Sequence, residues 1–385
     1  METTGYTDTR DRLIAQYDAG RLAHTLLVQG RPGWGALPMV LELASRILSP
    51  PAAPGLFGES SPSAPTMLLD HPDLHISYPF INTNSTGGTI TDESIITWKS
   101  YVRDNPYTND LDWFHHLSST LSGNRKNPMG NINKAECDNM LKKLSLKAFG
   151  DNPKMLIIWY PEYLVKEGNR LLKTLEEPTD ETYIIMISEN AQNILRTIRS
   201  RCQSVQMTPW SDEEIRTALQ SKHPQLAVDK ISDAVRRAEG DMRRALQLAE
   251  SDTSMESDAV LQWFRLCYAD QIAELKKLTE SFAAMSKDLQ IEWMEYNLFF
   301  LAQILRQKSQ PDYAMLLSSS EASSAKKLGQ LLTLDTIDHM TILIEKAIVQ
   351  IGRNANPRLL MMNISMLFHS LLRTGKLPEY SLTTV

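Results

Sequence analysis

This sequence of 385 residues has few cysteines, no long apolar run and no excess of positive charge. Its three cysteines, Cys137, Cys202 and Cys267, stand far apart in the chain, which excludes a disulfide scaffold and a local Cys/His zinc cluster. The most apolar helical stretch, residues 293–305, is interrupted by polar side chains and falls short of the about 18 uninterrupted apolar residues of a membrane span. We therefore expect neither a bound metal nor a membrane anchor.

The charge balance also excludes a class of function. Forty basic residues stand against 46 acidic ones, for a net charge of −6. A protein that grips DNA alone through a broad basic face is usually basic overall, so any role with DNA is expected to be local or shared with partners. Residues 1–13 have neither the basic lead nor the apolar core of a secretory signal. A sparse, odd cysteine count is typical of a reducing compartment, so we expect a cytoplasmic protein.

The composition that remains is that of an ordinary globular protein, with 42% hydrophobic and 22% charged residues. In the first half, short and almost wholly apolar runs alternate with helical patterns. Strands separated by helices in this way predict an α/β fold, with a parallel sheet covered by helices on both faces. The expected strands are residues 25–29, 154–160, 183–188 and 203–207.

After residue 208 the strand patterns stop. Ser211 and Glu214 form the pattern of a helix capping box, and three short helices are expected from there to about residue 252. The rest of the chain is helical, with expected breaks near residues 308–312 and 318–324. We predict three domains. They are a core at 1–208 with a loop at 49–70 and a helical insertion at about 81–129 (helices at 92–103 and 111–122), a three-helix lid at 209–252 and an all-helical domain at 253–385.

The turn after the first expected strand has the glycine spacing of a phosphate-binding loop but not its chemistry. In the GxxxxGK[ST] pattern the Lys contacts the outer phosphates and the Ser/Thr hydroxyl binds Mg²⁺. Here Gly30, Gly33 and Gly35 keep the turn, while Ala36 and Leu37 stand where the Lys and the Ser/Thr belong. On its own, the turn is also compatible with an ordinary glycine-rich link from strand to helix.

The metal-binding acids are missing in the same way. In ATPases of this kind a neighbouring strand ends in adjacent acids that order Mg²⁺ and activate water. Here Trp159 and Tyr160 occupy those positions, and the nearest acid, Glu162, is interpreted as a solvated loop side chain. We therefore expect no tightly bound ATP and no intrinsic ATPase activity.

Two segments then resemble known signatures. Residues 169–178 (NRLLKTLEEP) and 194–203 (ILRTIRSRCQ) are similar to the LLKxLEEP and TIxSRCQ motifs of AAA+ clamp-loader subunits. Four weaker matches stand in the order that the family has. They are residues 22–27 (LAHTLL), 71–75 (HPDLH), 240–246 (GDMRRAL) and 354–359 (NANPRL).

The resemblance implies an AAA+ core, a small lid and a helical collar that supplies oligomer contacts. It implies a non-hydrolysing accessory subunit of a DNA polymerase III clamp loader. Its partners would be the ATP-hydrolysing tau/gamma subunits and the delta subunit, with the beta sliding clamp and primer-template DNA reached through the complex. Such subunits usually carry a four-cysteine zinc module after the phosphate loop; residues 49–70 contain no cysteine, so no zinc is expected. The insertion at 81–129 lies outside the family pattern.

Two arginines receive roles from the resemblance. Arg201, in the SRC motif, is implied to reach the ATP held by a neighbouring subunit and to act as an arginine finger on its γ-phosphate. Arg243, at the sensor-2 position, would contact nucleotide in an active subunit and is expected here to join core and lid. Two alternatives stay open: an active tau/gamma-like AAA+ ATPase, and a degenerate AAA+ adaptor for another partner in DNA metabolism.

Overall fold

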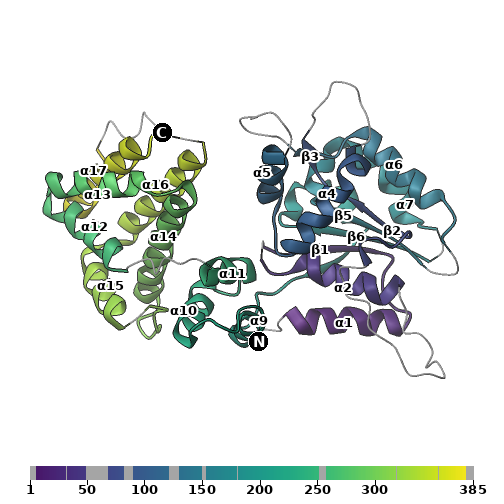
Figure 1. Ribbon diagram of the computed structural model, residues 1–385, viewed down its shortest axis with the longest axis horizontal. Coiled ribbons are helices and arrows are strands. Elements are labelled where there is room, and N and C mark those ends of the chain that lie inside the picture. The colour runs from purple at the N-terminus through teal and green to yellow at the C-terminus, as the bar shows by residue number, and fades with distance from the viewer. Residues whose placement is uncertain are drawn as a thin grey trace. The chain divides into compact units, whose positions relative to one another are not determined.

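A five-stranded parallel sheet organises the first part of the chain (Figure 1). The computed structural model describes residues 6–31, 33–48, 68–81, 90–120, 130–149, 153–179, 181–250, 257–317, 319–353 and 355–378. The strands lie in the order β2-β5-β6-β1-β7, and every neighbouring pair is parallel. Their bounds are β1 (Thr25–Gln29), β2 (Leu74–Ser77), β5 (Lys154–Trp159), β6 (Thr182–Ser188) and β7 (Gln203–Gln206).

The central strands bury both of their faces. Val28 and Ile157 point into one hydrophobic cluster, while Leu27 and Ile158 point into the cluster on the other side. This is why these strands read as continuous apolar runs. The predicted parallel sheet with helices on both faces is confirmed, but the sequence missed β2, a four-residue edge strand with a histidine inside it.

Helices from separate parts of the chain cover the two faces. The first cluster is closed by α1 (Tyr6–Asp18), α2 (Ala36–Leu48), α4 (Ile90–Asp104) and α5 (Asp110–Thr120). The second is closed by α6 (Lys134–Ser145), η1 (Pro161–Leu171), α7 (Leu172–Glu176) and α8 (Arg196–Arg199). Three smaller elements complete this part: β3 (Phe80–Ile81), β4 (Gly130–Asn131) and η2 (Ala191–Asn193).

The expected insertion is helical and contributes to the core. Helices α4 and α5 correspond to the two helices predicted there. Trp98 of α4 and Trp113 of α5 are fully buried against Tyr78, with Trp98 stacked at 5.0 Å between ring centroids. The expected loop at 49–70 lies, up to residue 67, outside the described residues.

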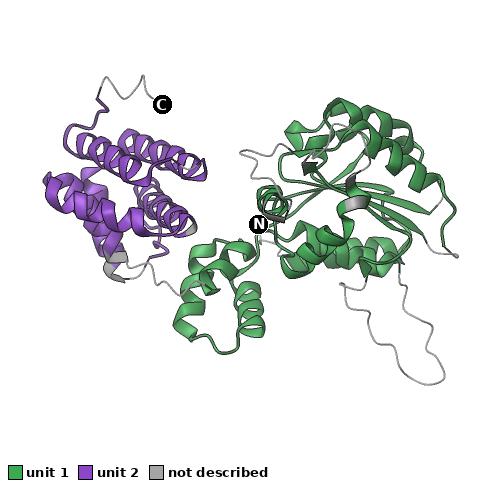
Figure 2. Ribbon diagram, turned by 45° about the horizontal axis from the view of Figure 1, so that its top comes forward, with its two compact units in different colours: residues 1–250 green, residues 251–385 purple. Residues whose placement is uncertain are grey.

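Three short helices follow β7: α9 (Asp212–Lys222), α10 (Val228–Ala238) and α11 (Met242–Glu250). The capping box at the start of α9 is confirmed, because the Ser211 hydroxyl accepts from the Glu214 backbone while the Glu214 carboxylate accepts from the Ser211 backbone. The chain divides into two compact units, residues 1–250 and 251–385 (Figure 2). A separate boundary between core and lid near residue 208 stays a prediction.

The second unit is helical throughout its described part. Its helices are α12 (Ser257–Ala269), α13 (Ile272–Ala284), α14 (Lys287–Ser309), α15 (Ser319–Leu331), α16 (Leu334–Gly352) and α17 (Pro357–Thr374). The break expected at 308–312 matches the end of α14. The break expected at 318–324 is wrong, because α15 begins at Ser319 and buries Ala325 in the core of this unit. None of the helices in the described part of the chain has the length and apolarity to cross a membrane.

Candidate functional site: a filled phosphate-loop pocket

The glycine-rich turn has the backbone shape that its spacing predicts. It connects β1 to α2, and Gly33 and Gly35 adopt φ of +78° and +81°, a region that residues with a Cβ rarely enter. Ala36 is the first residue of α2, and Leu37 is buried in the core. These two residues therefore begin the helix that follows the turn, and neither side chain carries a group that binds phosphate or metal.

Lid residues occupy the surface of this turn. The indole of Trp210 and the backbone N–H of Met242 both donate to the Gly33 carbonyl, each at 3.1 Å. A Cβ added to Gly33 would lie 1.8 Å from a carboxylate oxygen of Asp241. The turn thus needs glycine for close contact with the lid as well as for its backbone conformation.

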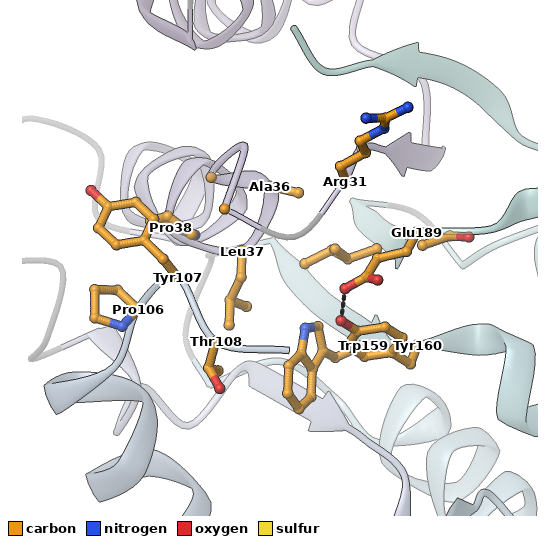
Figure 3. A pocket seen from close by; sticks show the side chains of 15 residues that line it. Arg31, Ala36, Leu37, Pro38, Pro106, Tyr107, Thr108, Trp159, Tyr160 and Glu189 are labelled. Atoms are coloured by element: carbon orange, nitrogen blue, oxygen red, sulfur yellow. Dashed lines mark hydrogen bonds between the residues drawn. The ribbon is translucent and has the colours of Figure 1, made fainter. Parts of the chain in front are cut away.

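Three segments far apart in sequence enclose what remains of the pocket (Figure 3). They are the glycine-rich turn, the ends of β5 and β6, and the link between α4 and α5 that carries Pro106, Tyr107 and Thr108. The cavity between them is about 30 Å³. That volume holds a water molecule or two, whereas ligand pockets typically measure about 300–1,000 Å³.

Aromatic rings replace the two acids. Trp159 is 2% exposed and meets Trp98 of the insertion edge-on, with centroids 5.8 Å apart. Tyr160 packs against Trp159 and donates its hydroxyl to Glu189 at the end of β6. Neither ring can ligate Mg²⁺, which prefers oxygen ligands such as carboxylates.

Glu162 has a structural role that the sequence did not reveal. It was expected to be a solvated loop side chain, but its Oε1 accepts from the Ser188 hydroxyl and from the backbone N–H groups of Glu189 and Asn190, at 2.6, 3.1 and 2.9 Å. Burial raises the pKa of Glu162, although these hydrogen bonds oppose the shift. The carboxylate therefore joins the start of η1 to the end of β6.

Arg243 contacts the insertion. Its Nη2 lies 2.7 and 2.6 Å from the two carboxylate oxygens of Asp112 on α5. The side chains are 28% and 32% exposed, so the ion pair is partly shielded from water. The structure thus brings the sensor-2-like arginine to a residue outside the family pattern.

A column of aromatic rings lies beside the same pocket. Tyr6 stacks on Trp210 at 4.1 Å between centroids, and Tyr107 meets Trp210 edge-on at 5.9 Å. Burial raises the pKa of Tyr107 to about 12, so its phenol stays neutral. Sequence reasoning missed Tyr107 and Asp112, although the density of aromatic residues between 98 and 114 was a signal that this segment is buried.

Arg201 lies between α8 and the edge strand β7. Its guanidinium pairs with Glu176 at the end of α7 and donates from Nη1 to the Thr197 carbonyl at 2.8 Å. Both charged side chains are substantially exposed, at 31% and 49%. The neighbouring Cys202 is half-buried, and burial raises the pKa of its thiol to about 11, so it has no character of a nucleophile.

The described residues contain no group of three or more His, Cys, Asp or Glu side chains placed to hold a metal ion. Cys137 and Cys267 are buried, and all three cysteines are free thiols. The expectation that the protein holds no zinc remains a prediction. Asn354, which begins the last of the matched motifs, lies outside the described part of the chain.

Comparisons with known proteins point to one family. A family model described as DNA polymerase III, delta subunit, matches residues 6–211. The chain is 23% identical over 256 residues to the DNA polymerase III subunit delta′ of Escherichia coli K12. This alignment covers 66% of the present chain and 62% of that protein. It is 29% identical over 131 residues to the subunit delta′ of Bacillus subtilis, covering 33% and 38%. The chain therefore aligns with less than two thirds of the length of either relative.

Solved structures give only weak likeness. A gamma-subunit-related protein of Thermotoga maritima is 14% identical, with 95% of this chain and all of that chain covered and a TM-score of 0.39. The clamp-loader delta protein of Bacillus subtilis is 9% identical, with 94% and 99% covered and a TM-score of 0.32. These scores carry no inference about function. The family match spans more than half of the sequence, and the chain therefore belongs to the DNA polymerase III delta-subunit family.

Proposed function

We propose that the chain is a delta′-type subunit of the DNA polymerase III clamp loader that neither binds nor hydrolyses ATP itself. The observation that carries this proposal is the filled pocket at the phosphate loop. Four groups that nucleotide chemistry needs are replaced by Ala36, Leu37, Trp159 and Tyr160, and the cavity that remains there, lined in part by Tyr107, is about 30 Å³. An active tau/gamma-like ATPase would need this space open and these groups present.

In this proposal the chain acts on ATP through Arg201. A guanidinium can neutralise charge on a γ-phosphoryl group during its transfer, and an arginine supplied in trans is worth about 10³-fold or more in known systems. Arg201 is held by Glu176 in an exposed ion pair, and such pairs contribute about 1 kcal/mol or less. Moving Arg201 from Glu176 to a neighbour's phosphate would therefore cost little.

The proposed partners are the tau/gamma ATPase subunits and the delta subunit, with the beta sliding clamp and primer-template DNA met through the assembled complex. The helical unit at 251–385 would supply the lasting contacts between subunits. Three free thiols suit a reducing cytoplasm. We expect neither zinc nor ATP in the purified protein, and metal analysis that found one zinc per chain would contradict this part of the proposal.

The decisive experiment is reconstitution with the tau/gamma and delta subunits of the same organism. The chain should co-purify with them, and clamp loading on primed DNA should depend on it. Isolated chain titrated with MgATP in a calorimeter should give no heat of tight binding. Sub-micromolar ATP binding would favour the active ATPase, and failure to join the tau/gamma and delta subunits would favour the adaptor.

Arg201→Ala tests the catalytic part of the proposal within that complex. We expect normal assembly with lowered ATPase and clamp-loading rates. The loss for the whole complex should be smaller than the effect of an arginine finger at one active site, because Arg201 serves only one of several ATP sites. Arg170→Ala is the matched control, since Arg170 also makes exposed ion pairs, with Asp138 and Glu167. Unchanged turnover in an intact Arg201→Ala complex would leave Arg201 with a structural role alone.

A further inference from the structure

The helical unit at 251–385 carries an apolar groove between α12 and α15. Its volume is about 410 Å³, far larger than the space left at the phosphate loop. Its walls are one face of each of these two helices, on which the lining residues have similar sequence spacing. They are formed by Leu261, Phe264, Arg265, Tyr268 and Ala269 on α12 and by Ser324, Lys327, Leu328 and Leu331 on α15.

On each helix the residues that face the groove include an i, i+3, i+4, i+7 set, to which α12 adds Ala269 at i+8. This spacing marks one continuous stripe of a helix surface. Leu261 and Phe264 are buried and form its floor, whereas Tyr268 is 42% exposed and Leu331 is 61% exposed. Two apolar stripes with a gap between them, and large side chains exposed at the rim, have the shape that accepts a third helix.

The charged residues that line the groove are of one sign. Each stripe contributes one cation, Arg265 or Lys327, and the lining contains no Asp or Glu. Within the described part of the chain, neither cation forms an ion pair. A third cation, Arg373, lies over the Tyr268 ring with its Cζ 5.2 Å from the centroid. An apolar groove whose charged lining residues are both cations is complementary to an apolar stripe bordered by carboxylates.

We propose that this groove is a docking site for an amphipathic helix of another protein, whose apolar stripe is flanked by Asp or Glu residues. The apolar stripe lies on Phe264 and Leu328, and the carboxylates pair with Arg265 and Lys327. This assignment rests on the contacts of the second unit alone, so it stands or falls separately from the function proposed for the phosphate-loop pocket.

The test uses a defined probe on the full chain. A fluorescein-labelled synthetic peptide carries leucines at i, i+3, i+4 and i+7 with glutamates on both sides of the stripe, and a second peptide carries lysines in place of the glutamates. Fluorescence anisotropy should show that the glutamate peptide binds about tenfold more tightly, since two partly exposed ion pairs form in one case and two repulsions in the other. The preference should shrink as salt is raised.

Three variants make the test specific. Leu331→Glu should abolish binding, and the double variant Arg265→Glu with Lys327→Glu should reverse the preference to the lysine peptide. Leu359→Glu is the control, because Leu359 is a 71% exposed leucine of α17 that does not line the groove. Circular dichroism checks that each variant stays folded. Absence of binding by both peptides, equal binding of the two, or an equal loss in Leu359→Glu would overturn the proposal.

Discussion

The ion pair between Arg243 and Asp112 is predicted to hold the lid to the insertion, and a double-mutant cycle measures its strength. Arg243 lies in the first turn of α11 and Asp112 in the first turn of α5. One guanidinium nitrogen lies within 2.7 Å of both carboxylate oxygens. The cycle needs Arg243→Ala, Asp112→Ala and the double variant. The coupling energy is the sum of the stability losses of the two single variants minus the stability loss of the double variant.

The magnitude follows from exposure. Fully exposed pairs couple by about 0.2–1 kcal/mol, and breaking a fully buried pair costs about 3–5 kcal/mol. At 28% and 32% exposure this pair lies between the two, so we expect about 1–2 kcal/mol. The matched control is Arg103 with Asp70, which has the same 2.6 Å separation but a 63% exposed carboxylate. Its coupling should be about 0.5 kcal/mol or less.

Native-state hydrogen exchange on the full chain is the suitable assay, because two compact units can unfold in separate transitions and a single global unfolding free energy is then not defined. Amide protection within α11 reports the free energy of opening that helix. Protection in α11 should fall in each single variant, and the two losses should be less than additive. Coupling no larger than that of the control pair would refute the idea that Asp112 anchors the lid.

Three further predictions concern the pocket and the core. Restoring the missing groups with Ala36→Lys and Leu37→Thr should not restore MgATP binding in calorimetry, because the space for a nucleotide stays filled. Trp98→Ala should lower the opening free energy of the first unit, measured by native-state hydrogen exchange, by about 3–5 kcal/mol, as expected for a fully buried large aromatic. Ile96→Ala, 81% exposed on the same helix, should change it by about 0.5 kcal/mol or less. Glu162→Gln should reduce the loss of stability as the pH rises, measured by melting temperature.

The sign of the last effect follows from linkage. Burial raises the pKa of Glu162 in the folded protein, so the folded state holds this proton where the unfolded state has released it. The stability that Glu162 contributes is present below its unfolded pKa and is lost as the pH rises through its folded pKa. Glutamine keeps an oxygen for the three donors and has no charge to bury. An identical pH profile for the variant and the wild type would contradict this reasoning.

The predictions for the phosphate-loop variant and for Trp98→Ala each have an outcome that would contradict them. Micromolar ATP binding by the Ala36→Lys, Leu37→Thr variant would mean that the insertion moves aside readily and that the pocket is closed only in the absence of nucleotide. A stability loss for Trp98→Ala no larger than that of Ile96→Ala would mean that the insertion is not part of the folded core.

Much of the fold could be predicted because its signals are local. A strand with both faces buried is apolar over most of its length, as in β1 and β5, where the polar residues stand only at the strand ends. The capping box of α9 is contained in four consecutive residues. The edge strand β2 was missed because an edge strand of four residues, one of them a histidine, lacks that signal. The expected break at 318–324 was wrong because burial of Ala325 outweighs the low helix preference of serine.

The features of the candidate site also fall into those that the sequence determined and those that only the tertiary structure decided. The sequence by itself determined which groups stand at the phosphate-loop positions, since a missing lysine or carboxylate is a property of single residues. Only the tertiary structure decided that Tyr107 lines the pocket, that Asp112 meets Arg243 and that Glu162 joins η1 to β6. These contacts join segments far apart in the chain. They depend on how these segments pack in three dimensions, and no local spacing encodes that packing.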